Sequence, residues 1–282
     1  MRNGSALWQK LFAECLGTGF LVLFGAGAVT ATFSIQRIAA FMSEANLGII
    51  ALSFAIIIAA MIYAVGRVSG AHLNPAITVG LAVRKHIDWP TAGGYIVAQF
   101  VGGFIGALLI AVFFGRTAAT EGILGVPFYQ MPTSTYQAFF AEAIGTFVLV
   151  FTVYGLAVDR QAPTGWAGLI IGLIVGGVIM VIGPVTGGSI NPARAFGPML
   201  AQTVLGGPNF LGQFWVYLIA PLVGGIVAAF TYEFLTAQVR RPTAIPAGPE
   251  VSEREAWRAP EGVERDRSAR HTEEDIGGAA RA

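Results

Sequence analysis

The sequence contains two copies of the tripeptide Asn-Pro-Ala, and these copies carry its clearest chemical signal. Asparagine is among the best helix N-caps, and proline suits the first helical position because the N–H that it lacks would have no intrahelical partner. Each copy therefore predicts the start of a helix, with an asparagine amide that can also donate to a passing oxygen atom. The copies comprise Asn74, Pro75 and Ala76, and Asn191, Pro192 and Ala193.

Each copy follows a loop that contains glycine and precedes about ten moderately apolar residues. A helix of that length is too short to cross about 30 Å of hydrocarbon, so a re-entrant half-helix is predicted. Two such half-helices would point their N-termini, each equivalent to roughly +0.5 charge, at one another in the middle of the membrane. Protons and cations would meet a positive electrostatic barrier there.

Arg194 lies three residues after Asn191, so it projects from the same face of the second half-helix. It stands near the positive end of the helix dipole, where a cation is disfavoured, and we therefore expect a functional rather than a structural role. The corresponding residue of the first half is Ile77. The guanidinium is thus expected to narrow only one end of a pore.

Glu14 and Glu142 are the carboxylates that fall clearly inside apolar runs, where an ionisable group is a functional hypothesis by default. One hypothesis is proton relay. The other is that each accepts hydrogen bonds from backbone N–H groups of the re-entrant loops, and the symmetric placement of the pair favours it. His72 lies in the first loop with no second ligand nearby to indicate a metal site. Cys15 is expected to be a packing residue.

These residues require elements that hold them inside a bilayer. The chain is 55% hydrophobic and 12% charged, with a mean hydropathy of +0.67, which is far too apolar for an ordinary soluble domain. Six runs are long enough to span, and they must be helices because open sheet edges cannot lie in lipid. The predicted fold is an all-α membrane protein with six transmembrane helices and two half-helices. The spans are 11–31, 47–65, 92–114, 138–158, 166–182 and 214–235.

The predicted elements form an internal repeat. Residues 13–24, which begin with Ala-Glu, match residues 141–151, and one Asn-Pro-Ala follows each. Each repeat holds three spans, an odd number, so the second must enter the membrane from the opposite face. The sequence therefore predicts an inverted repeat, with repeat 1 at about 8–115, repeat 2 at about 136–236, and a site at their interface near the midplane.

These motifs make the sequence resemble the major intrinsic proteins, the aquaporin and aquaglyceroporin family. The resemblance covers residues 8 to about 236 and rests on Ser-Gly-Ala-His-Leu-Asn-Pro-Ala at 69–76, Gly-Ser-Ile-Asn-Pro-Ala-Arg at 188–194 and the paired Ala-Glu helices. It implies six tilted helices around a single-file pore in each protomer, and a homotetramer. It also favours loop support over proton relay for Glu14 and Glu142.

The resemblance makes Arg194 a member of the family's extracellular selectivity filter, and matching by spacing gives Phe54, Ile179 and Gly188 as the other members. Water-selective relatives commonly carry His in place of Ile179, and glycerol facilitators commonly carry Trp in place of Phe54. The filter looks closer to archaeal aquaporins and to the nodulin-like group. We therefore expect water and small uncharged solutes such as glycerol to pass and protons and ions to be excluded, with ammonia and metalloid hydroxides left open.

The distribution of charged residues separates the chain into two parts and predicts its orientation in the membrane. Residues 1–239 carry 9 Lys and Arg and 7 Asp and Glu, whereas residues 240–282 carry 8 Arg and 9 Asp and Glu. We predict a channel domain at 1–241 and a disordered cytoplasmic tail at 242–282, which has too few bulky aliphatic residues to offset its ordering entropy. The loops of one side hold most of the basic residues of the channel domain, which places both termini in the cytoplasm of a plasma-membrane protein.

Other function classes are excluded or left open. A net charge of +1 with scattered basic residues argues against nucleic-acid binding. The sequence shows no catalytic triad, metal cluster or phosphate loop, so neither an enzyme nor a cofactor is predicted. An ion- or proton-coupled secondary transporter stays open because it also uses inverted repeats and broken helices, although its midplane needs an ion-coordinating site and this one offers two asparagines. A structural junction protein on the same scaffold also stays open.

Overall fold

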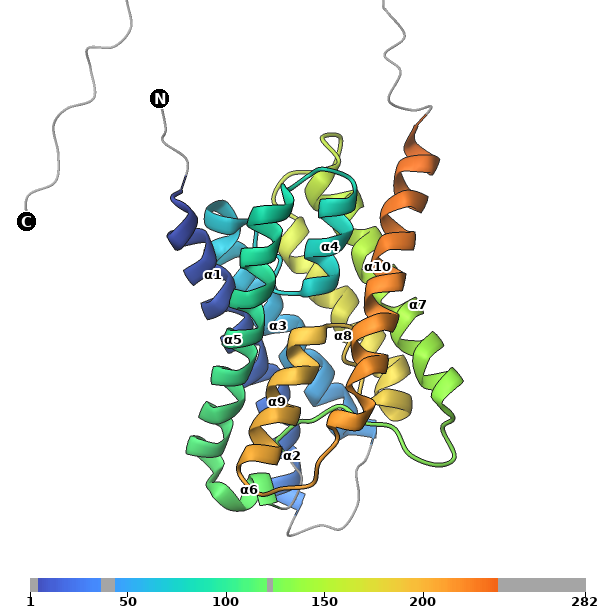
Figure 1. The fold of residues 1–282 in the computed structure, drawn as a ribbon. Helices are drawn as coiled ribbons and strands as arrows, with labels where there is room; N and C mark the ends of the chain where they lie inside the picture. Colours follow the sequence, from blue (N-terminus) through green and yellow to red (C-terminus); the bar gives the residue numbers. More distant parts are fainter. Residues whose placement is uncertain (1–4, 37–43, 121–123, 238–282) are drawn as a thin grey trace, which may run out of the picture. The chain divides into compact units, whose positions relative to one another are not determined.

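Helices form all the regular structure of the residues that the computed structural model describes, namely 5–36, 44–120 and 124–237. They belong to one unit, Met1–Ala237 (Figure 1). The predicted tail at 242–282 lies outside the described residues. The elements are α1 (Leu7–Phe20), η1 (Leu21–Ala26), α2 (Gly27–Gln36), α3 (Glu44–Ser69), α4 (Pro75–Val83), α5 (Trp89–Phe114), α6 (Arg116–Thr120), α7 (Thr135–Val153), η2 (Tyr154–Val158), α8 (Ala167–Thr186), α9 (Pro192–Val204), η3 (Leu211–Gln213) and α10 (Phe214–Thr236).

Six helical segments are long and apolar enough to cross a bilayer, as the sequence predicts. The first combines α1, η1 and α2, the fourth combines α7 and η2, and the sixth combines η3 and α10. The spans differ from the predicted ones in detail. The fifth was expected to end at Ile182, but α8 continues through Pro184 to Thr186. The first and fourth contain π-helical turns, η1 and η2, in place of continuous α-helix.

Two shorter helices, α4 and α9, start inside the bundle and run toward opposite ends of it (Figure 1). Helix α4 has 9 residues and α9 has 13, and both begin with the predicted Asn cap and Pro. Helix α4 packs against α10, and α9 packs against α5, so each half-helix contacts the last span of the other repeat. This exchange interlocks the two repeats.

Glycine permits the close approach between each half-helix and that span. An ideal Cβ on Gly103 of α5 would lie 2.5 Å from the carbonyl oxygen of Ala193, and one on Gly225 of α10 would lie 2.9 Å from that of Ala76. Small residues let helix backbones approach closely in lipid, where packing replaces the hydrophobic effect as the driving force. The two matching contacts follow the inverted repeat.

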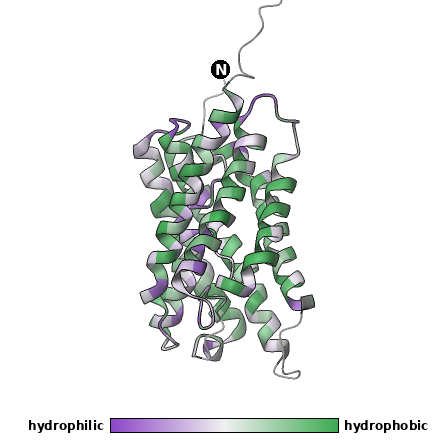
Figure 2. Ribbon diagram, turned by 90° about the vertical axis from the view of Figure 1, so that its right-hand side faces the viewer, coloured by the Kyte–Doolittle hydropathy of each residue, from purple (hydrophilic) through white to green (hydrophobic). Residues whose placement is uncertain are grey.

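The outward faces of the long helices are apolar. Figure 2 shows hydrophobic residues along the length of the outer helices. Large side chains such as Trp8, Val112, Phe113 and Phe234 are exposed on them. A continuous apolar surface of this kind suits hydrocarbon rather than water. The polar residues that form the candidate site are buried instead.

Candidate functional site

The two half-helices meet through their capping asparagines. Oδ1 of Asn74 accepts a hydrogen bond from the Ala76 N–H at 2.8 Å, and Oδ1 of Asn191 accepts from the N–H groups of Ala193 at 3.0 Å and Arg194 at 3.2 Å. Each amide nitrogen reaches across to the other loop. Asn74 Nδ2 donates to the Ile190 carbonyl, and Asn191 Nδ2 donates to the Leu73 carbonyl, both at 2.8 Å.

These crossed hydrogen bonds refine the role predicted for the amides. A side-chain amide has two N–H donors, and the contact with the opposite loop uses one of them. One donor on Asn74 and one on Asn191 remain for a permeating molecule, and both residues line the central cavity. A molecule held there meets two donors and the positive ends of two helix dipoles.

Glu142 lies behind the second loop and is fully buried. Its Oε1 accepts from Thr186 Oγ1 at 2.6 Å and from the Ser189 N–H at 2.9 Å, and its Oε2 accepts from the Ile190 N–H at 2.6 Å. These three hydrogen bonds give both oxygens of the buried carboxylate a partner. This arrangement matches the loop-support hypothesis.

Glu14 holds the first loop in the same way. It accepts from Ser69 Oγ at 2.6 Å and from the N–H groups of His72 at 2.9 Å and Leu73 at 2.7 Å. It also accepts from Gln99 Nε2 at 2.8 Å, a residue that the analysis of the sequence did not single out. A polar residue in the apolar run at 92–114 was the signal that could have found it.

Both loops adopt left-handed backbone conformations directly before the capping asparagines. The φ angle is +51° at Leu73 and +46° at Ile190, the residues before the two capping asparagines. For a β-branched residue such as Ile190 this conformation is an outlier that costs on the order of 1–3 kcal/mol. It turns the N–H of Leu73 and Ile190 toward a glutamate and the carbonyl toward the opposite asparagine.

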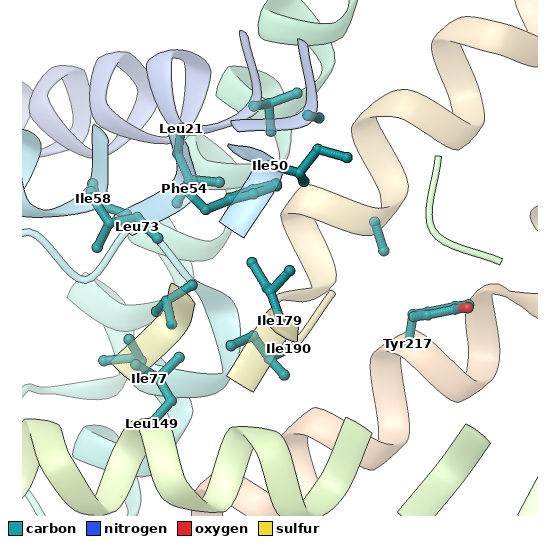
Figure 3. Close-up of a cluster of buried hydrophobic side chains, with 14 of the residues drawn as sticks. Leu21, Ile50, Phe54, Ile58, Leu73, Ile77, Leu149, Ile179, Ile190 and Tyr217 are labelled. Carbon is teal, nitrogen blue, oxygen red and sulfur yellow. The ribbon is translucent and has the colours of Figure 1, made fainter. Parts of the chain in front are cut away.

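A cavity of about 350 Å³ extends from Arg194 past both asparagines to His86. Apolar side chains from several helices form most of its wall, while polar groups come from the two loops and their half-helices. Figure 3 shows several of the apolar residues, among them Leu21, Phe54 and Ile179. Such a passage gives a permeating molecule one row of hydrogen-bonding partners and an apolar wall opposite. The apolar wall includes Leu21, Phe54, Ile58, Ile77, Leu149, Ile171, Val175 and Ile179.

Three of the four predicted filter residues line this cavity, namely Phe54, Ile179 and Arg194. Arg194 is only 2% exposed, its Cζ lies 5.1 Å from the centroid of the Phe54 ring, and its Nη1 donates to the Gly125 carbonyl at 2.8 Å. Gly188 does not line the cavity. Its φ angle is +58°, and a Cβ built on it would lie 3.2 Å from Cγ1 of Ile179, so it lies beside that residue.

The end of the cavity near His86 has a cluster of charged residues that the analysis of the sequence missed. Arg84 donates two hydrogen bonds to Glu233 of α10, one of them from Nε at 2.6 Å, and these bonds raise the pKa of Arg84. His86 Nε2 lies 3.4 Å from the other oxygen of Glu233. The residues are far apart in sequence, so only the packing of α4 against α10 reveals the cluster.

The sole cysteine, Cys15, lies on α1 and does not line the cavity. We therefore expect permeation to resist mercurial reagents, with water flux reduced by less than about a third after treatment, since no thiol stands where an adduct would obstruct passage. Stopped-flow light scattering on proteoliposomes measures this. Rapid, thiol-reversible block that disappears in Cys15→Ser would contradict the placement of this residue.

In the part of the chain that the structure describes, no group of three His, Cys, Asp or Glu residues could hold a metal ion. The buried carboxylates of Glu14 and Glu142 instead accept hydrogen bonds from the two loops. Six spans, two half-helices that meet at their N-termini and a passage between them define a membrane channel. Residues 2–232 match the family model of the major intrinsic proteins, and the chain belongs to this family.

The relatives of this chain are named as water and solute channels. It is 43% identical over 244 residues to an aquaporin, AqpM, of Methanothermobacter thermautotrophicus, covering 83% of this chain and 99% of the relative. It is 33% identical over 222 residues to glycerol uptake facilitator protein-like 6 of Lactiplantibacillus plantarum, covering 79% and 95%. The solved structure of the Plasmodium falciparum aquaglyceroporin superposes with a TM-score of 0.71 at 25% identity, covering 83% and 98%.

Proposed function

We propose that this protein is a passive channel for water and for neutral solutes of about the size of glycerol, and that it excludes protons and ions. The proposed range of solutes rests on the composition of the cavity wall opposite Arg194. That wall consists of Phe54 and Ile179, which offer a solute no hydrogen-bonding partner of their own. Small neutral molecules with both apolar and hydroxyl surface suit such a passage better than water alone.

The same site supplies the barrier to ions. The buried guanidinium of Arg194 and the two opposed half-helix N-termini present positive charge along the passage. Among the residues that the structure describes, no carboxylate lines the cavity, and Glu14 and Glu142 are hydrogen-bonded to the loops. A coupled transporter needs a charged or ion-coordinating site near the midplane, and this arrangement does not favour one.

Location and assembly belong to the same proposal. Both ends of the described unit, α1 and the end of α10, lie at one end of the bundle (Figure 1), which supports a plasma-membrane protein with both termini in the cytoplasm. The excess of basic loop residues on that side supports the same orientation. We assign the channel to residues 1–241 and a cytoplasmic tail to 242–282. The resemblance to the family supports a homotetramer, with each protomer holding its own pore.

The substitution Ile179→His tests the proposed solute range. Histidine extends farther from the backbone than isoleucine and adds a polar partner beside Arg194, so the glycerol flux is expected to fall by about tenfold or more while the water flux falls much less. Stopped-flow light scattering on proteoliposomes measures both fluxes. The double change with Gly188→Cys is less informative, because φ at Gly188 is +58° and any side chain there is strained.

The matched control for this test is Gly177→Ala, which adds a methyl group two residues away, at a position with no neighbouring atom within 4 Å. It should leave the ratio of glycerol to water flux unchanged. An Ile179→His variant with the wild-type ratio would show that the wall of the filter lies elsewhere.

A further inference from the structure

The Phe54 ring lies against a residue that has no side chain. Gly25 belongs to η1, and an ideal Cβ built on it would lie 2.4 Å from both Cδ1 and Cε1 of Phe54. Carbon atoms in favourable contact are about 3.5–4.0 Å apart. The observed position of the ring therefore requires that residue 25 be glycine.

The ring is confined on its other sides as well. Phe54 is 2% exposed and packs in the apolar cluster with Leu21 and Ile50, as Figure 3 shows. The open space next to it is the cavity, which Phe54 and Arg194 both line, and Cζ of Arg194 lies 5.1 Å from the ring centroid. A ring displaced from Gly25 is expected to move into the cavity toward Arg194 and to narrow the passage.

The turn η1 also supports the second filter residue. Gly125 has a φ angle of +69° and packs against the Ala26 carbonyl. An ideal Cβ built on Gly125 would lie 2.4 Å from the Ala26 carbonyl oxygen. The carbonyl of Gly125 in turn accepts the hydrogen bond from Arg194 Nη1. Gly25 and Ala26 are neighbours in one π-helical turn. Gly25 lies against Phe54 itself, and Ala26 contacts Gly125, which supports Arg194.

A third contact fixes η1 to the helix that carries Phe54. Ser53 Oγ donates to the Phe24 carbonyl at 2.9 Å. Ser53 directly precedes Phe54, so this hydrogen bond sets the backbone of the filter residue relative to the π-helical turn. The turn and the filter are therefore expected to move together.

We propose that η1 determines which neutral solutes fit the filter, with Gly25 as a specificity-determining positioning residue for Phe54 and the contact of Ala26 with Gly125 as the support of Arg194. Gly25 does not line the cavity, so it acts only through the ring. The inference rests on the proposed function and names the element that sets its solute range.

The test compares Gly25→Ala, Phe54→Leu and the double variant, with Gly177→Ala as the matched control, in proteoliposomes that report water, urea and glycerol flux by stopped-flow light scattering. Gly25→Ala should lower the glycerol flux by about tenfold or more and the water flux by less than about threefold. Phe54→Leu removes the ring that the new methyl group displaces. The double variant should therefore recover glycerol flux, which a general loss of folding would not allow.

Other outcomes would overturn either the inference or the proposed range of solutes. A wild-type flux ratio in Gly25→Ala, or no recovery in the double variant, would overturn the inference. So would poor accumulation of both Gly25 variants when Phe54→Leu alone accumulates normally, because the methyl group would then clash with something other than the ring. A wild type that passes water but neither urea nor glycerol would overturn the proposed solute range instead. In that case water flux should still fall in Gly25→Ala and recover in the double variant if Gly25 positions the Phe54 ring.

Discussion

Replacing Glu142 by leucine is expected to abolish water flux and to prevent most of the protein from folding. The carboxylate accepts hydrogen bonds from Thr186 Oγ1 and from the N–H groups of Ser189 and Ile190. Leucine accepts none, and each buried donor left without a partner costs about 1–3 kcal/mol. Three such donors together approach the net stability of about 5–15 kcal/mol that is typical of a folded protein.

The glutamine variant separates hydrogen bonding from size. Glu142→Gln keeps one accepting oxygen but turns an N–H group toward a donor, so it should be intermediate between the wild type and Glu142→Leu. Glu14→Gln and Glu14→Leu should follow the same order, since the first loop has the same contacts. Thermal unfolding of purified protein and water flux per protein measure the effect. Equal unfolding temperatures for Glu142→Leu and the wild type would contradict the support role.

Replacing Arg194 by valine is expected to let protons or cations pass while water flux persists. A unit charge about 4 Å from a passing cation raises its energy by about 4 kcal/mol at an effective dielectric constant of 20. Each 1.4 kcal/mol removed from a barrier raises a rate about tenfold. The half-helix dipoles remain in the variant, so we expect an increase of about tenfold or more rather than complete loss of exclusion.

The matched control is Arg194→Lys, which keeps the charge but lacks the planar fork that donates to the Gly125 carbonyl. It should still exclude cations. A pH-sensitive dye inside proteoliposomes reports proton entry, and light scattering on the same vesicles reports water. If Arg194→Val excludes protons as well as the wild type does, the half-helix N-termini alone form the barrier.

Features with a local cause could be predicted from the sequence. The six spans follow from runs of apolar residues, and the half-helices follow from the capping chemistry of Asn74 and Asn191 in segments too short to cross. The matching Ala-Glu pairs show the inverted repeat. The family model confirms the resemblance that these motifs indicate. The relatives favour a passive channel over a coupled transporter.

Features that depend on packing between distant segments could not be predicted. Nothing in the residues 21–26 indicates a π-helical turn or its contacts with Phe54 and Gly125, which are distant in the sequence. The carbonyl that holds Arg194 comes from a loop 69 residues earlier in the chain. The family resemblance and the spacing predict Gly188 as a filter residue, whereas the structure places it beside Ile179 rather than on the cavity wall. The roles of all these residues stay predictions.

A parallel flux assay on the wild-type protein distinguishes a passive channel for neutral solutes from a coupled transporter. Proteoliposomes that hold a pH-sensitive dye are exposed in turn to an impermeant osmolyte, to glycerol and to a pH step. For a passive channel we expect rapid water flux and rapid glycerol entry, both above those of empty vesicles, with proton entry no faster than in empty vesicles. Water flux without entry of glycerol or any smaller neutral solute, or uptake driven by the pH gradient, would contradict it.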